Sequence, residues 1–161
     1  FSMSQVSVTR SEDDFSFRTW PFYWLTRASG RYLQNMEEAL RPIGLDIPRW
    51  RVLMVLHEEE CASVSEIADH AISKLSTMTK IVQRMQADGL VTCRPRASDA
   101  RVTEVLLTEA GRKAGEKAWK AANGVYSQAF KSMRKSDIGT LNRLLEQLAT
   151  KLAEDGPGGV D

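Results

Sequence analysis

Length, composition and charge exclude several classes of protein. The chain has 161 residues, which suits one compact domain with helical extensions and is too short for two complete domains. Its 42% hydrophobic and 27% charged residues are ordinary for a globular protein, and its formal net charge of +1 excludes a uniformly basic nucleic-acid coat protein. No apolar run approaches the roughly 20 residues of a membrane helix and no signal-peptide pattern is found, so we expect a cytoplasmic protein without membrane contact.

The N-terminal part predicts a polar arm followed by one long helix. Residues 1–14 are polar and aperiodic, which predicts a disordered arm, and the two residues before Met3 are expected to be a tag remnant. Apolar side chains recur at helical intervals through residues 15–45, with a start near Pro21 because proline suits a first helical turn. This segment is expected to serve as a first dimerisation helix.

Residues 46–108 predict three helices and a hairpin. Asp46 is placed to cap a helix that ends near residue 58, and Ser63 with Glu66 matches the capping box that opens a short helix to about residue 70. A third helix follows, with apolar side chains at three- and four-residue steps, and ends at a glycine suited to a left-handed cap, Gly89. Residues 90–94 and 101–107 then predict two strands joined by a turn.

Two further helices are expected in residues 109–155, followed by a flexible tail, residues 156–161. The first is rich in alanine and small residues, and the second starts at Ser136 or Asp137. The second helix carries an apolar seam with alternating three- and four-residue spacing, made of Ile138, Leu141, Leu145, Leu148 and Leu152. Such a seam needs a partner, so we expect these helices to form a homodimer interface.

The order of elements predicts a mainly α protein with a small β-hairpin wing. Three helices followed by a hairpin form a winged helix-turn-helix lobe, in which the third helix enters the major groove of DNA. Between residues 74 and 101 the chain has six basic and two acidic residues, so positive charge is concentrated there. The candidate DNA contacts are Ser73, Lys74, Ser76, Thr77, Lys80, Gln83, Arg84, Arg94, Arg96, Asp99 and Arg101.

The hairpin and the start of the next helix resemble a known family. Asp99-x-Arg101 at the hairpin tip and Leu107-Thr108-x-x-Gly111-Arg112 after it are similar to the motifs of the MarR family of transcriptional regulators. The resemblance spans about residues 49–112. It implies that a homodimer binds a pseudo-palindromic operator, that Arg101 reaches the minor groove, and that Asp99 holds the wing tip. A surface ion pair that only braces the turn is the alternative reading of this motif.

Relatives in that family often bind a small aromatic ligand beside the DNA-binding lobe, which loosens DNA binding. Aromatic and basic side chains in the first two helices could build such a pocket for an aromatic acid or its coenzyme A thioester. The candidates are Trp20, Phe22, Tyr23, Trp24, Arg27, Arg31, Trp50, Arg51, Met54 and His57. Packing in the core or the dimer interface would equally explain aromatic residues at helical spacing.

Other functions remain as alternatives. No phosphate loop, nucleophile elbow or paired-carboxylate set is found, so no catalytic residue and no cofactor is expected. Cys61 and Cys93 lack CxxC spacing, which favours reduced thiols over a disulfide or a metal site. A metal- or redox-responsive regulator stays open, and so does a winged-helix interaction module that binds no ligand.

Overall fold

The structure, a computed structural model, describes residues 9–156. The chain divides into two compact units, residues 1–122 and residues 123–161, and each is considered by itself. Most of the predicted disordered arm lies outside the described residues, but its last part forms a 3-10 turn, Glu12–Asp14. Regular structure therefore begins slightly before residue 15, where the sequence predicted it. No helix within residues 9–156 combines the length and apolar composition that a bilayer crossing requires.

Helix α1 spans Pro21–Leu40, as predicted, with proline in its first turn. It buries Met36 and Leu40 in the core and ends in a 3-10 turn, after which Gly44 takes a left-handed conformation with φ +72°. Glycine adopts this conformation without the Cβ clash that other residues suffer, so the chain can reverse there.

Helices α2 and α3 begin at the two predicted caps. In α2, Ile47–Glu58, the Asp46 carboxylate accepts a hydrogen bond from the Arg49 N–H at 3.0 Å. In α3, Val64–His70, the Ser63 hydroxyl accepts from the Glu66 N–H at 3.0 Å, and the Glu66 carboxylate accepts from the Ser63 N–H at 2.9 Å. Both ends thus satisfy backbone donors that the first helical turn leaves unpaired.

Helix α4, Leu75–Ala87, packs its apolar stripe of Met78, Val82 and Met85 into the core. It ends at Asp88, and Gly89 has φ +75°, as the sequence predicted. The turn between α3 and α4 is less ordinary, because Ile72 has φ +50° and its side chain is 92% exposed.

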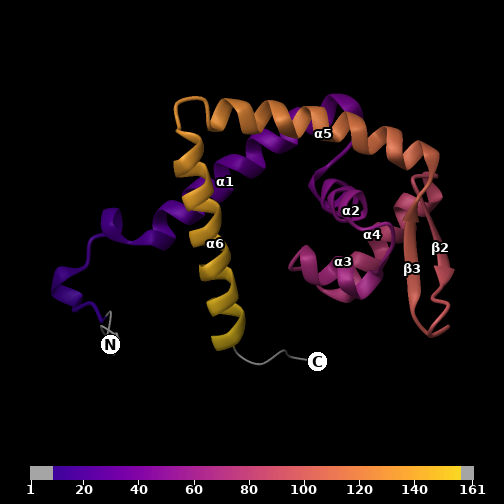
Figure 1. Cartoon of the computed structure of the whole chain (residues 1–161), viewed down its shortest axis with the longest axis horizontal. Coiled ribbons are helices and arrows are strands. Elements are labelled where there is room, and N and C mark those ends of the chain that lie inside the picture. The colour runs from indigo at the N-terminus through magenta and orange to yellow at the C-terminus, as the bar shows by residue number, and fades with distance from the viewer. Residues whose placement is uncertain (1–8, 157–161) are drawn as a thin grey trace. The chain divides into compact units, whose positions relative to one another are not determined.

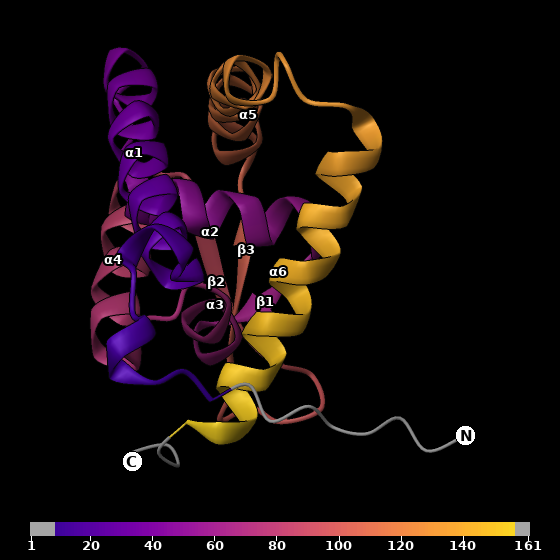
Figure 2. The ribbon, with the colours of Figure 1, turned by 90° about the vertical axis from the view of Figure 1, so that its left-hand side faces the viewer.

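The sheet has three strands, one more than predicted. Strands β2, Val91–Pro95, and β3, Thr103–Leu107, form the expected antiparallel hairpin, and β1, Ala62–Ser63, pairs with the other edge of β3. The prediction of only two strands was wrong because a strand of two residues has no alternation for a pattern to reveal. In both views the hairpin extends beside α2, α3 and α4 (Figure 1, Figure 2).

Helix α5, Glu109–Ala129, is anchored at its start to the base of the hairpin. The Thr108 hydroxyl accepts from the Gly111 N–H at 3.0 Å and donates to the Gly89 carbonyl at 2.6 Å. A Cβ at Gly111 would collide with the carbonyl oxygen of Leu90, so only glycine lets α5 approach the hairpin this closely.

The second compact unit contains the end of α5 and helix α6, Lys135–Asp155. The unit boundary falls inside α5, after Ala122, whereas the sequence placed a boundary before α5. The α6 seam stays accessible in the single chain: Leu141, Leu145 and Leu152 are exposed, and Ile138 and Leu148 are half-buried. Apolar side chains in this state favour packing against another subunit.

Candidate nucleic-acid interface

The predicted DNA-reading side chains of α4 lie on its solvent face. Lys74 precedes the helix and is exposed, and Ser73 beside it is half-buried. The polar side chains opposite the buried stripe are all exposed: Ser76, Thr77, Lys80, Gln83 and Arg84. Hydroxyl and amide groups of this length can reach base edges, and the two cations can reach phosphates.

A groove runs between α4 and the hairpin. Its wall on the helix side includes Leu75, Thr79 and Gln83, and its wall on the hairpin side includes Arg96 and Arg101. The helix that would enter the major groove and the hairpin tip therefore belong to one surface of the winged lobe, as a winged helix requires.

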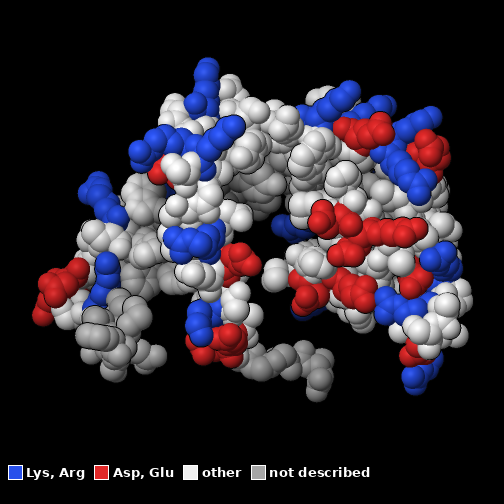
Figure 3. Space-filling view, in the orientation of Figure 1, with Lys and Arg blue, Asp and Glu red and all other residues white. Residues whose placement is uncertain are grey.

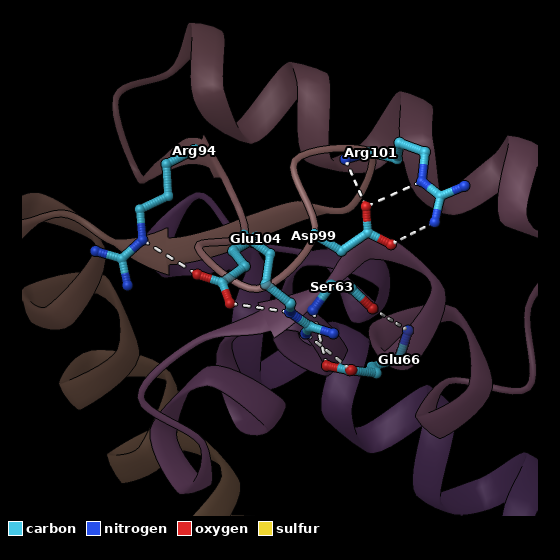
Figure 4. A network of polar contacts seen from close by, with 7 residues as sticks. Ser63, Glu66, Arg94, Asp99, Arg101 and Glu104 are labelled. Atoms are coloured by element: carbon cyan, nitrogen blue, oxygen red, sulfur yellow. Dashed lines mark hydrogen bonds and ion pairs between the residues drawn. The ribbon is translucent and has the colours of Figure 1, made fainter.

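The hairpin tip is held by a bidentate ion pair. Asp99 accepts from Arg101 through Nε at 3.0 Å and Nη2 at 3.1 Å, and also from the Arg101 backbone N–H at 3.1 Å (Figure 4). The side-chain hydrogen bonds from Arg101, followed by its backbone hydrogen bond, lower the pKa of Asp99. The Arg101 side chain is 91% exposed, so Asp99 fixes the orientation of a guanidinium that otherwise faces solvent.

The end of the hairpin next to its turn carries a second set of ion pairs, here called the wing network: Glu66, Arg94, Arg96 and Glu104. Glu104 accepts from Arg94 Nε at 3.1 Å and from Arg96 Nε at 3.0 Å, and Arg96 Nη2 reaches Glu66 at 3.0 Å. Hydrogen bonds from Arg96 and then Arg94 lower the pKa of Glu104. The pKa of Glu66 is lowered chiefly by the Ser63 N–H and then by Arg96.

The sequence predicts Arg94 and Arg96 as DNA contacts but missed the two carboxylates that face them. One signal was available, since Arg94 and Glu104 are opposite each other across the hairpin. Glu66 could not be found this way because it lies 30 residues before Arg96. On the face drawn in Figure 3, basic and acidic side chains lie side by side at the lower end of the hairpin, so the local charge is partly offset.

A pocket of about 300 Å³ lies between α2 and the first half of α5. Of the predicted ligand residues it contains Trp50, Met54 and His57. The His57 and Trp119 rings stack with their centroids 6.0 Å apart and an interplanar angle of 14°. The residues that the sequence did not assign to the pocket are Leu53, Leu56, Leu107, Arg112, Gly115, Glu116 and Trp119. The α5 members among them recur at helical spacing, which was the available signal.

The predicted ligand residues of α1 form a separate cluster. Tyr23 packs against Trp24 with ring centroids 5.0 Å apart, and the Arg27 guanidinium lies 5.6 Å from the Tyr23 ring centroid. Trp20 packs on Phe22, and Arg31 donates to Gln34. Within this chain the structure does not bring these side chains to the pocket beside α2, and their role in ligand binding stays a prediction.

The two cysteines are free thiols, and both are half-buried. Burial raises the pKa of Cys93, which disfavours its reactive thiolate form. Within residues 9–156, no three histidine, cysteine or acidic side chains gather in a group that could hold a metal ion.

Known proteins that resemble this chain in sequence support the assignment of a winged helix-turn-helix lobe. The model of the MarR family matches residues 45–103. The HTH-type transcriptional repressor IacR of Pseudomonas putida is 48% identical over 136 residues, covering 84% of this chain and 81% of that protein. This identity extends well beyond the winged lobe into the flanking helices.

Two solved structures share the fold. CouR from Rhodococcus jostii RHA1, bound to p-coumaroyl-CoA, has a TM-score of 0.77 at 22% identity, covering 91% of this chain and 99% of that one. A mutant MarR from E. coli, complexed with operator DNA, has a TM-score of 0.69 at 20% identity, covering 78% of this chain and 90% of that one. Together with the family match and the close relative, the winged lobe shows that this chain belongs to the MarR family of DNA-binding transcriptional regulators.

Proposed function

We propose that this chain is a cytoplasmic transcriptional repressor that binds a pseudo-palindromic operator as a homodimer and performs no catalysis. The observation that carries the proposal is the common surface of α4 and Arg101 on either side of one groove. In the proposed complex α4 reads the major groove and Arg101 enters the minor groove, whose negative potential suits a planar guanidinium. The similarity to a repressor over most of both chains supports repression as the outcome.

In the proposal, a second copy of the chain completes the DNA-binding dimer. The exposed leucines of α6 supply an apolar surface for it. A twofold dimer then presents two α4 helices to half-sites about one DNA turn apart, near 10 to 10.5 base pairs.

The test is retardation of DNA from the promoter beside the protein's own gene, with wild type and Arg101→Ala. We expect the variant to bind roughly tenfold or more weakly, because it loses the minor-groove contact. Arg134→Ala is the matched control, since Arg134 forms a similar ion pair with Asp137 outside the winged lobe. Equal affinity of wild type and Arg101→Ala would refute the role of Arg101. No retardation by wild type at low salt would favour the interaction module.

The pocket between α2 and α5 supports an effector of the aromatic acid class, free or as its coenzyme A thioester. Trp50, His57 and Trp119 offer aromatic walls, and Arg112 offers a guanidinium for a carboxylate. The p-coumaroyl-CoA bound to CouR, which has the same fold, supports this class. An effector acts by preferring a dimer geometry that cannot span both half-sites, which shifts the population away from the DNA-binding form.

A thermal-shift and tryptophan-fluorescence panel of aromatic acids and their thioesters tests this part. We expect at least one compound to raise the melting temperature, quench fluorescence and weaken operator binding. Trp119→Ala should abolish the response, whereas Tyr32→Ala, at an exposed aromatic residue outside the pocket, should retain it. A panel without any response would remove the effector from the proposal.

A further inference from the structure

The wing network joins three parts of the winged lobe through one continuous set of hydrogen bonds. Both Glu104 carboxylate oxygens are engaged, each by a different arginine of β2 or the turn after it. Arg96 donates through Nε to Glu104 and through Nη2 to Glu66. Glu66 in turn caps α3 through its second oxygen. The network therefore runs from the hairpin to the first turn of α3 (Figure 4).

Burial distinguishes the Arg96–Glu104 pair from an ordinary surface ion pair. The Glu104 side chain is only 12% exposed and that of Arg96 28%, whereas Glu66 is 48% and Arg94 58% exposed. A pair at such a site is screened less by salt than a fully exposed pair, and charge-assisted bonds with matched geometry hold a side chain firmly. Two of the three guanidinium nitrogens of Arg96 are thus engaged by carboxylates of its own chain.

The turn end of the hairpin needs such a constraint. The strands contact α2, α3 and α4, and Val91 and Val105 are buried, but residues 96–102 of the turn are exposed or half-buried. Strand β1 adds only two residues to the other edge of β3. Because α3 packs directly against α4, a tie from the hairpin to α3 also sets the hairpin's position relative to α4. Without it the tip that carries Arg101 would sample many positions, and fixing it on DNA would cost conformational entropy.

We propose that Arg96, Glu104 and Glu66 are positioning residues that lock the wing to the start of α3, so that Arg101 is presented to DNA in register with α4. This inference rests on the proposed function, in which the wing contacts the operator. It also gives Arg96, which contacts two carboxylates of its own chain, a positioning role in place of the phosphate contact predicted from the sequence.

Carboxylate variants distinguish a positioning role from a simple charge effect, because the two change DNA affinity in opposite directions. Glu104→Gln and Glu66→Gln each add one positive charge per subunit, and charge alone strengthens DNA binding. Loss of the contacts that hold the wing to α3 weakens DNA binding, by roughly 2- to 30-fold. The probe is a duplex that wild-type protein selects from a random-sequence pool. Asp69→Asn, on the same helix α3 but outside the network, is the matched control and should bind as wild type or more tightly. Equal or tighter binding by Glu104→Gln overturns the proposal.

Arginine variants distinguish a positioning role from a contact with DNA, because only the loss of a DNA contact changes how strongly affinity depends on salt. Arg101→Ala should reduce the slope of log affinity against log salt concentration by about 1 to 2, since each dimer loses two contacts. Arg96→Lys keeps the charge but cannot bridge two carboxylates in the same way. We expect Arg96→Lys to lower affinity at every salt concentration with an unchanged slope. Wild-type affinity for Arg96→Lys, or a slope change in Arg96→Ala equal to that of Arg101→Ala, overturns the assignment.

Hydrogen exchange tests the lock without DNA. The hairpin turn is closed by the Arg96 N–H to Val102 carbonyl bond at 2.8 Å and the Val102 N–H to Asp99 carbonyl bond at 3.0 Å. In Arg96→Lys and Glu104→Gln these amides should exchange faster, while those of α4 exchange as in wild type. Unchanged exchange in the hairpin overturns the proposal. If wild-type protein selects no duplex, the proposed function fails on its own, and the exchange result still decides whether the wing is locked.

Discussion

Ile72 places a β-branched side chain where the backbone is left-handed. Its φ of +50° is costly for any residue with a branched Cβ, and its side chain is 92% exposed, so little packing offsets that cost. We expect Ile72→Asn to stabilise the fold by about 1 kcal/mol, because asparagine tolerates the left-handed region. Thermal unfolding should show a rise of roughly 2–8 °C. Ile72→Val, which keeps the branch, should leave the melting temperature unchanged, and a lower value for Ile72→Asn would contradict the reading of strain.

The carboxylates of the wing network make the free energy of unfolding depend on pH. Their pKa values lie below the ordinary 4.5 in the folded protein, so the network's contribution is complete above about pH 5 and is lost as the pH falls through the lowered values. We expect the difference in unfolding free energy between wild type and Glu104→Gln to stay constant above pH 5 and to shrink below pH 4.5. Urea unfolding across a pH series measures this difference. A difference that persists unchanged to pH 3 would contradict the lowered pKa of Glu104.

At the scale of elements, Gly111 fixes how α5 docks on the hairpin. A Cβ there would meet the Leu90 carbonyl and approach the Leu107 side chain to 3.2 Å. We expect Gly111→Ala to destabilise the fold by about 1–3 kcal/mol through overpacking. Gly124→Ala, also in α5 but with open space around its Cβ, should instead stabilise it by about 0.5–1 kcal/mol. Denaturant unfolding of both variants checks the pair, and a neutral Gly111→Ala would show that α5 can shift.

Local signals explain which elements the sequence could predict. The Asp46 cap, the Ser63 and Glu66 capping box and the left-handed Gly89 lie within a few residues of the helix ends they define, and the structure confirms all three. Strand β1 was missed because its two residues are specified by β3, far along the chain. Glu66 and the Trp119 side of the pocket were missed for a similar reason, since their partners, Arg96 and His57, meet them only after folding.

At the scale of the whole molecule, the α6 seam carries the proposed dimer. Leu145 is 39% exposed in the single chain, and the proposed dimer covers it with a second copy. We expect Leu145→Lys to dissociate the dimer, because a charge would be left in an apolar interface. Sedimentation velocity should show monomers, and Gln147→Lys, outside the seam, should remain dimeric. A stable Leu145→Lys dimer would place the interface on another surface.

Hydroxyl-radical footprinting of wild-type protein on its selected duplex tests the dimeric winged-helix reader most directly. We expect two equivalent protected regions, related by a twofold axis and centred about 10 to 10.5 base pairs apart, with two chains bound per duplex. A single protected region with one chain bound would contradict it.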